Sequence, residues 1–215
     1  MKKKYKIWLI LIVVLLVLVI IIGIISLFLK PKENQEVNST NVLTSIEKYK
    51  YTLDDRDTKY MKDTFIELEN ILNSEEINYN DYAQVLSKLF VIDFYTLNNK
   101  INKYDIGGLE YILTDKVDMF KNKAMDTIYK DIIDNTYKDR IQELPEITEV
   151  KVIDFNVSKI NINDAQEDCY EITLEYKYKK DLGYDSKGIV YIIKNGDKLE
   201  IAKYEALNNI EEQIN

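Results

Sequence analysis

The stretch GIVYIIKNGDKLEIAKYEA, residues 188–206, decides the fold class. It reads as two strands joined at Asn195-Gly196, a dipeptide that favours a type I′ turn and therefore predicts a β-hairpin. The stretch CYEITLEYKY, residues 169–178, comes shortly before it and alternates apolar with polar side chains, as a strand with one buried face does. The C-terminal part of the chain is therefore predicted to form antiparallel strands.

A longer strand is predicted before these, over residues 147–163. Its alternation changes phase twice, first between Val152 and Ile153, and the last strand changes phase between Ile201 and Ala202. A change of phase indicates a β-bulge, and bulges bend sheets. We therefore expect a strongly curved antiparallel sheet of about four strands.

The half of the chain that precedes Pro145 is predicted to be helical. Apolar residues recur at helical spacing over residues 57–73, from about residue 80 onward, and after Thr114, which we expect to cap the third helix. Gly107 and Gly108 are expected to end the second helix. Helices followed by strands predict an α+β fold, in which about three helices cover one face of the sheet.

Asp93 is the one candidate site residue, and it lies inside the apolar run KLFVIDFYTLNNKI, residues 88–101. At 100° per residue it falls in the middle of the apolar face of the second helix. A buried carboxylate must be paired or protonated, so it could serve catalysis in a pocket or hold elements together through hydrogen bonds. No converging set of polar groups is evident, so we predict the structural role and expect Asp93→Asn to lower stability.

The N-terminal region reads as a membrane anchor. The 23 residues from Ile7 to Leu29 carry no charge, and a helix of that length covers about 34 Å, enough for a hydrocarbon core of about 30 Å. Four lysines precede the run, which places residues 1–6 in the cytoplasm and residues 46–215 outside, after a polar linker at residues 30–45. The expected location is the cell membrane, with a single span.

Composition excludes several kinds of chemistry. The chain has no histidine and one cysteine, Cys169, which excludes histidine-based catalysis, ordinary zinc sites and an internal disulfide. Phosphate-binding glycine motifs and calcium loops of the standard spacing are also missing. We therefore predict no catalytic residue, no cofactor and no metal, and a protein that is not an enzyme.

The charge balance limits the partners. The part after Lys32 holds 23 basic and 37 acidic residues, a net charge of −14, which opposes binding to the phosphates of nucleic acid. The bias toward lysine, asparagine and isoleucine favours an AT-rich genome such as that of a Gram-positive bacterium. The expected partners are the lipid bilayer and other membrane or extracytoplasmic subunits, with a homo-oligomer left open.

The layout resembles a known family. A short basic tail, one apolar span, a polar linker, three helices and a bent sheet are similar to the bitopic assembly subunit of type IV secretion and conjugation systems. The stretch LFVIDFYTLNNKINKYDIGG, residues 89–108, is most similar to Gram-positive members. The resemblance implies a cone-shaped fold shared with nuclear transport factor two and ketosteroid isomerase. The Asn-Pro-x-Gly turn of proteobacterial members is missing, because the only prolines are Pro31 and Pro145.

The resemblance implies a non-enzymatic, membrane-anchored scaffold of a secretion or conjugative transfer complex, which acts through protein–protein contacts. An extracytoplasmic domain that binds or senses a small ligand in the cone cavity is the alternative. A cavity filled by side chains would favour the scaffold, and an open cavity reached by Asp93 would favour the alternative.

Overall fold

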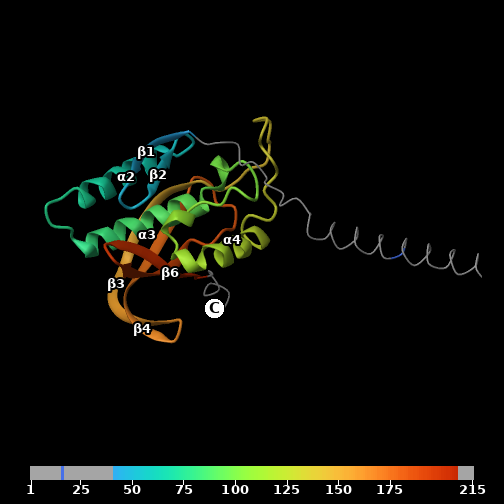
Figure 1. The fold of residues 1–215 in the computed structure, drawn as a ribbon. Coiled ribbons are helices and arrows are strands. Elements are labelled where there is room, and N and C mark those ends of the chain that lie inside the picture. The colour runs from blue at the N-terminus through green and yellow to red at the C-terminus, as the bar shows by residue number, and fades with distance from the viewer. Residues whose placement is uncertain (1–15, 17–40, 208–215) are drawn as a thin grey trace, which may run out of the picture. The chain divides into compact units, whose positions relative to one another are not determined.

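The computed structural model describes residues 41–207, together with Leu16. Three α-helices and six strands occur in this part of the chain, and the helices precede the larger sheet (Figure 1). Their bounds are β1 (Val42–Ile46), β2 (Tyr51–Asp54), α2 (Lys59–Leu72), α3 (Tyr79–Tyr95), α4 (Val117–Asp126), β3 (Ile147–Ile162), β4 (Ala165–Tyr178), β5 (Lys187–Asn195) and β6 (Lys198–Ala206).

The larger sheet is four-stranded and antiparallel, in the order β3-β4-β5-β6. Helix α3 contacts all four of its strands, and α2 packs against α3 (Figure 1). The strands β1 and β2 form a separate hairpin. The predicted α+β class, with three helices and a four-stranded antiparallel sheet, is confirmed.

Two of the three predicted irregularities of the sheet are confirmed, whereas the second phase change in residues 147–163 has no bulge, since the β3–β4 register is regular from Asp154 to Ile162. Ile153 has no partner between the pairs Val152–Leu174 and Asp154–Thr173, and Ala202 is skipped between the pairs that Ile201 and Lys203 make with β5. The β5–β6 turn differs from the prediction. Its central residues are Gly196 and Asp197, and only Gly196 has a positive φ, which fits a type II′ turn.

The helices bury the faces that the sequence predicted. In α2 the apolar face is buried, and the Thr58 side chain caps the helix by accepting a hydrogen bond from the Met61 N–H. Helix α3 is buried on nearly every side, as expected of a central helix, and its fully buried residues include Tyr82, Leu86 and Phe90. The core lies between α3 and the concave face of the sheet.

Three predicted details were wrong. Helix α3 ends at Tyr95 rather than at the glycines, because the chain turns at Thr96 into the short 3₁₀ helix Leu97–Asn99. Helix α4 begins at Val117, after a 3₁₀ turn, and the Thr114 side chain does not cap it. The alternation of residues 169–178 predicts that Cys169 lies on the polar side of its strand with Glu171, but it is buried in a small apolar cluster.

Three tyrosine hydroxyl groups join α3 to two strands of the sheet. The Tyr204 hydroxyl of β6 lies 3.0 Å from that of Tyr95, at the end of α3, and 2.9 Å from that of Tyr176 on β4. Tyr95 and Tyr176 are almost completely buried, so their hydroxyl groups need partners inside the fold, and the Tyr176 hydroxyl also donates to the Lys187 carbonyl at 3.4 Å. The inward-facing Tyr176 of β4 thus fills part of the core.

The predicted tail at residues 1–6 and, apart from Leu16, the predicted span at residues 7–29 lie outside the described residues. No helix in the described part of the chain is long and apolar enough to cross a membrane. Strand β1 begins at Val42, inside the range expected for the linker, so regular structure starts before residue 46.

Candidate functional site

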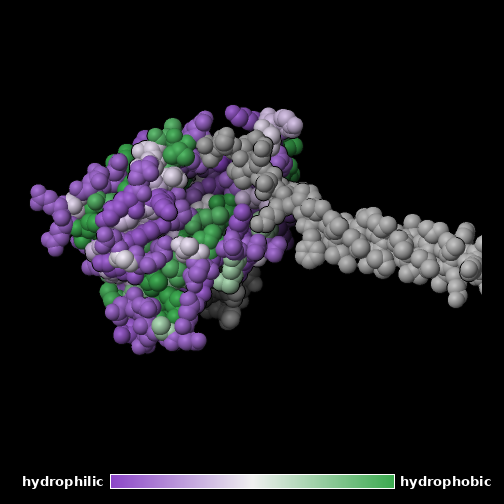
Figure 2. Space-filling model, in the orientation of Figure 1, coloured by the Kyte–Doolittle hydropathy of each residue, from purple (hydrophilic) through white to green (hydrophobic). Residues whose placement is uncertain are grey.

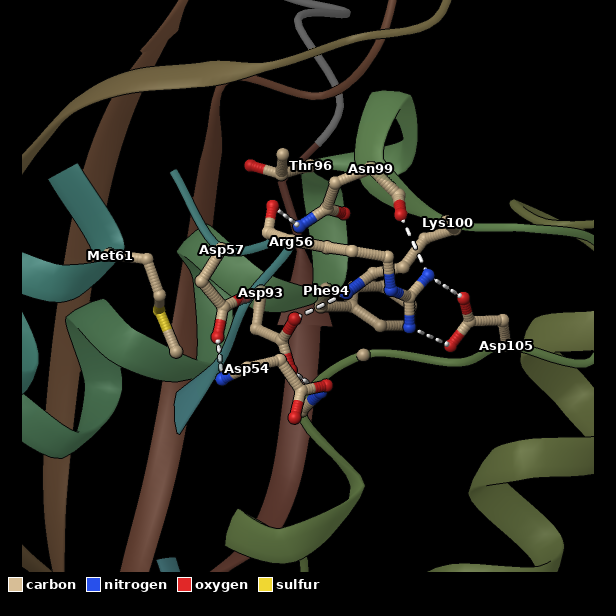
Figure 3. A network of polar contacts seen from close by, with 12 residues as sticks. Asp54, Arg56, Asp57, Met61, Asp93, Phe94, Thr96, Asn99, Lys100 and Asp105 are labelled. Atoms are coloured by element: carbon tan, nitrogen blue, oxygen red, sulfur yellow. Dashed lines mark hydrogen bonds and ion pairs between the residues drawn. The ribbon is translucent and has the colours of Figure 1, made fainter. Parts of the chain in front are cut away.

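A small pocket surrounds Asp93, and we call it the charged pocket (Figure 3). It has a volume of about 240 Å³ and lies between the β2–α2 turn, the last turns of α3 and the loop that follows. Its lining consists of Thr52, Asp54, Arg56, Asp57, Met61, Asp93, Lys100 and residues 105–110. Five carboxylates and two cations therefore face one another here.

Asp93 is held from two sides. Its carboxylate pairs with the Lys100 ammonium group and accepts a hydrogen bond from the Gly108 N–H at 2.5 Å. The side chains of Lys100 and Asp93 are only 7% and 19% exposed. Opposite charge is needed at such a depth, and here both partners come from the same short segment of chain.

The sequence did not reveal Lys100 as the partner. A continuous second helix, as the pattern predicts, would carry Lys100 about two turns away from Asp93. The chain instead leaves the helix at Thr96 and doubles back through the 3₁₀ turn, which returns Lys100 to the end of α3. The missed signal is the short distance in sequence between a buried acid and a lysine near a helix end.

A second ion pair connects the β2–α2 turn to the same loop. The Arg56 guanidinium donates to the Asp105 carboxylate at 2.5 Å and to the Asn99 carbonyl at 2.8 Å (Figure 3). Burial alone would raise the pKa of Asp105, but the bond from Arg56 and the charge of Lys100 outweigh burial and hold it below the usual range. Asp105 is therefore an ionised structural partner.

Two carboxyl groups of the pocket hold protons more tightly than usual. Burial raises the pKa of Asp57 to about 6, and the negative charge of Asp93 adds to the rise. Burial likewise raises the pKa of Glu110 to about 7, although the Thr52 N–H and hydroxyl donate to it at 3.1 and 2.7 Å. These two groups can exchange protons near neutral pH.

We expect Glu110→Gln to weaken the pH dependence of stability. Between its ordinary pKa of 4.5 and the folded value of about 7, the folded chain keeps a proton that the unfolded chain has released. This contribution is complete below about pH 4.5 and is lost as the pH rises through about 7. Because the amide cannot ionise, the variant should not show the fall of about 2 to 3 kcal/mol in the free energy of unfolding that the parent chain shows over this pH range. Urea unfolding at the two ends of this range measures the difference.

Glu67→Gln is the control, because Glu67 is exposed on α2. It should leave the pH profile of the parent unchanged. Equal losses of stability in the parent chain and in Glu110→Gln, from low to high pH, would contradict the assignment of the proton to Glu110.

The chemistry of the charged pocket is limited by its own contacts. Asp93, Asp105 and Glu110 are each engaged by donors of this chain. Within residues 41–207, no group of acidic or cysteine side chains is arranged to hold a metal ion. The ion pairs of the charged pocket therefore hold α3, the β2–α2 turn and the loop after α3 together.

The larger hollow lies elsewhere, between α4 and β6, and we call it the α4–β6 groove. It has a volume of about 700 Å³ and is lined by Ile112, Lys116, Met119, Phe120, Lys123 and residues 201–207. Its floor is apolar, and Met119 on its rim is 65% exposed. In Figure 2, hydrophobic residues reach an otherwise largely hydrophilic surface on this side of the molecule. The sequence could not reveal the groove, because its two walls are about eighty residues apart.

Comparisons with known proteins give little similarity. No protein-family model matches the chain, and no solved structure matches it. The chain is 34% identical over 114 residues to Increased recombination centers protein 6 of the yeast Vanderwaltozyma polyspora. The match covers 49% of this chain and 44% of the yeast protein, so the chain spans less than half of that relative.

This similarity corrects the predicted function. The relative is a yeast protein named for recombination centers, whereas a scaffold of bacterial secretion or conjugation was predicted, with an extracytoplasmic ligand-binding domain as the alternative. The prediction was wrong because it depended on a layout of helices and strands and on a biased composition. Neither is specific to one function.

The predicted location and partners are corrected by the same finding. A single-pass location in the cell membrane, the bilayer as partner of residues 7–29, and other subunits of a membrane complex do not agree with a yeast relative of this name. The Gram-positive origin inferred from composition and the partner prediction as a whole, including the homo-oligomer, are withdrawn with them.

Proposed function

We propose that the folded domain is a non-enzymatic protein-binding module and that it binds its partner in the α4–β6 groove. The proposal keeps neither the membrane location nor the role in secretion or conjugation. The observation that carries it is the groove itself, which has a volume of about 700 Å³ and an apolar floor, and which lies beside the exposed side chain of Met119. Concave apolar surfaces with a polar rim are typical binding sites.

The charged pocket supports this choice by contrast. Catalysis would need a polar group that is free to act on a substrate, and the carboxylates of Asp93 and Asp105 are held in ion pairs. The two carboxyl groups with raised pKa are also engaged, since Asp57 accepts from the Asp54 N–H and Glu110 accepts from Thr52. The pocket is also only about a third of the size of the groove. We infer that the ion pairs stabilise the domain and that the groove makes the external contact.

We also propose that the fold is the cone of the nuclear transport factor two type, as the family resemblance implies. Support comes from the order of the elements, with three helices first, and from the bulges at Ile153 and Ala202, which allow the sheet to curve around α3. Such a fold hosts many functions, so this kinship does not identify the partner.

A photo-crosslinking amino acid placed at Met119 tests the proposed function. Expressed in living cells and irradiated, the full chain should give a defined adduct with a partner protein, because position 119 lies on the rim of the groove. The same replacement at Ile66, which is exposed on α2 away from the groove, is the matched control. Mass spectrometry of the adduct identifies the partner and the contact peptide.

The expected result is an adduct at position 119 that is missing at position 66. Identical adducts at both positions, or none at position 119, would contradict binding in the groove.

A further inference from the structure

We propose that the occupant of the α4–β6 groove is an extended, acidic segment of a partner protein, which adds as a strand to the outer edge of β6. This inference rests on the proposed function and specifies the chemistry of the partner. Its two supports are the open edge of β6 and the charge of the groove lining.

The first support is the edge of β6, which is the last strand of the sheet. Near its middle, the Ile201 carbonyl already accepts a hydrogen bond on this side, from the Leu113 N–H at 2.9 Å. This contact shows that an added backbone can pair here. The strand end beyond it forms one wall of the groove.

The orientation of the remaining backbone groups follows from the ladder. The Leu207 N–H donates inward to the Lys187 carbonyl, so the alternation of an antiparallel strand directs the polar groups of Ala206 and Tyr204 outward. No backbone group between residues 41 and 207 pairs with these two on the outer side. Unpaired strand edges are templates for another strand, a common mode of peptide recognition.

The side chains beside this edge suit a strand with one apolar face. The Tyr204 side chain points into the core, where its hydroxyl meets other tyrosines, and Phe120 of α4 packs against Phe90 and Phe94. An added strand would place alternate side chains on this floor, under Met119. The open length, residues 203–206, would pair with about four to six residues of a partner.

The second support is charge. The chain as a whole is acidic, with a net charge of −8, whereas the groove lining contains three lysines and a single glutamate. Lys203 and Glu205 form an ion pair with each other, which leaves the cations of the α4 side, Lys116 and Lys123. Lys116 also lies 3.7 Å from Asp115 and hydrogen-bonds Asn163, so Lys123 is the stronger candidate for contact with the partner. A basic groove on an acidic protein selects acidic partners.

The test begins with a random octapeptide library displayed on phage and selected on the full chain, which is kept in solution with a non-ionic detergent. We expect enrichment of peptides in which apolar residues alternate with others and acidic residues exceed basic ones. A selected peptide is then synthesised with a fluorescent label and titrated by anisotropy. Its affinity should fall as salt is raised from about 50 to about 300 mM.

Two pairs of variants locate the peptide. Lys123→Glu should weaken binding about tenfold or more, whereas Lys121→Glu on the same helix, outside the groove lining, should change it less than about twofold. Ala206→Pro removes an outward N–H from an edge strand, where proline is tolerated, and should abolish binding. Ala206→Val keeps the N–H and should retain it. Circular dichroism establishes whether each variant is folded. If Ala206→Pro is unfolded, the comparison of Lys123→Glu with Lys121→Glu tests the inference.

Selection of basic or non-alternating peptides, or unchanged binding by folded Ala206→Pro or by Lys123→Glu, would overturn the inference. Two other occupants would also overturn it. A peptide affinity that rises about tenfold when residues 208–215 are deleted would assign the groove to this chain's own segment. Loss of peptide binding as the chain dimerises in sedimentation would assign it to a second copy. If any of these results were found together with a photo-crosslinked partner at position 119, the proposed function would be supported, and only the inference of an acidic added strand would be rejected.

Discussion

Replacing Lys100 with methionine is expected to lower the free energy of unfolding by about 3 to 5 kcal/mol. The substitution keeps an unbranched side chain of similar length but leaves the Asp93 carboxylate without its cation in the charged pocket. Asp57 and Asp105 also lose their electrostatic attraction to the Lys100 ammonium group. A buried charge without a partner is among the most costly single changes in a folded protein.

Urea unfolding of the full chain measures this loss. Lys59→Met is the matched control, because Lys59 forms an ion pair with Asp63 on the surface of α2 and is 87% exposed, so the change should cost less than about 1 kcal/mol. Adding Asp93→Asn to Lys100→Met should recover part of the stability, since the amide needs no cation. Equal costs for the two lysine variants, or no recovery in the double variant, would show that the Asp93–Lys100 pair does not stabilise the fold.

Gly107→Ala is expected to destabilise the domain by about 3 kcal/mol or more. A Cβ atom at this position would lie 2.2 Å from the Asp93 carbonyl oxygen and 2.8 Å from the Asp93 Cγ atom. The first of these atoms belongs to the backbone of α3 and cannot move without the helix. The loop would have to retreat, and the hydrogen bond from the Gly108 N–H to Asp93 would be lost with it.

Gly196→Ala separates this clash from a general effect of losing glycine. Gly196 has a φ of 65° in the β5–β6 turn, and no atom lies within 4 Å of a Cβ built there. Its cost should be about 1 kcal/mol, from the backbone conformation alone. Thermal unfolding compares the two variants, and amide exchange at Gly108 reports the lost bond directly. A cost at Gly107 no larger than that at Gly196 would refute the close approach.

The strands were predictable because their information is local. Alternation located β4, β5 and β6, and the breaks in alternation found the bulges at Ile153 and Ala202 to the residue. The helix ends were harder. Apolar residues continue past Tyr95, so the pattern favoured a longer helix, and only the tertiary contacts of Thr96 and Lys100 show why the chain turns there. Strand β1 carries exposed residues along most of its length and so lacks the pattern of a half-buried strand.

The sites were predictable only in part. A carboxylate in an apolar run identified Asp93 as a residue of interest, because such a group must find a partner. The identity of that partner depended on a reversal of the chain that no periodicity records. The α4–β6 groove depended on two segments that meet only in the fold, and its exposed Met119 looks in the sequence like any other apolar residue of a helix.

The three tyrosines that meet at Tyr204 have a consequence for the accuracy of folding. A slip of β6 along β5 by two residues would keep every apolar side chain on its proper face, so burial alone discriminates poorly against it. Such a slip would move the Tyr204 hydroxyl by one full repeat and remove it as a partner of the buried Tyr95 and Tyr176 hydroxyl groups. The hydroxyl cluster therefore favours the native register of β6 over a shifted register that would bury the same apolar side chains.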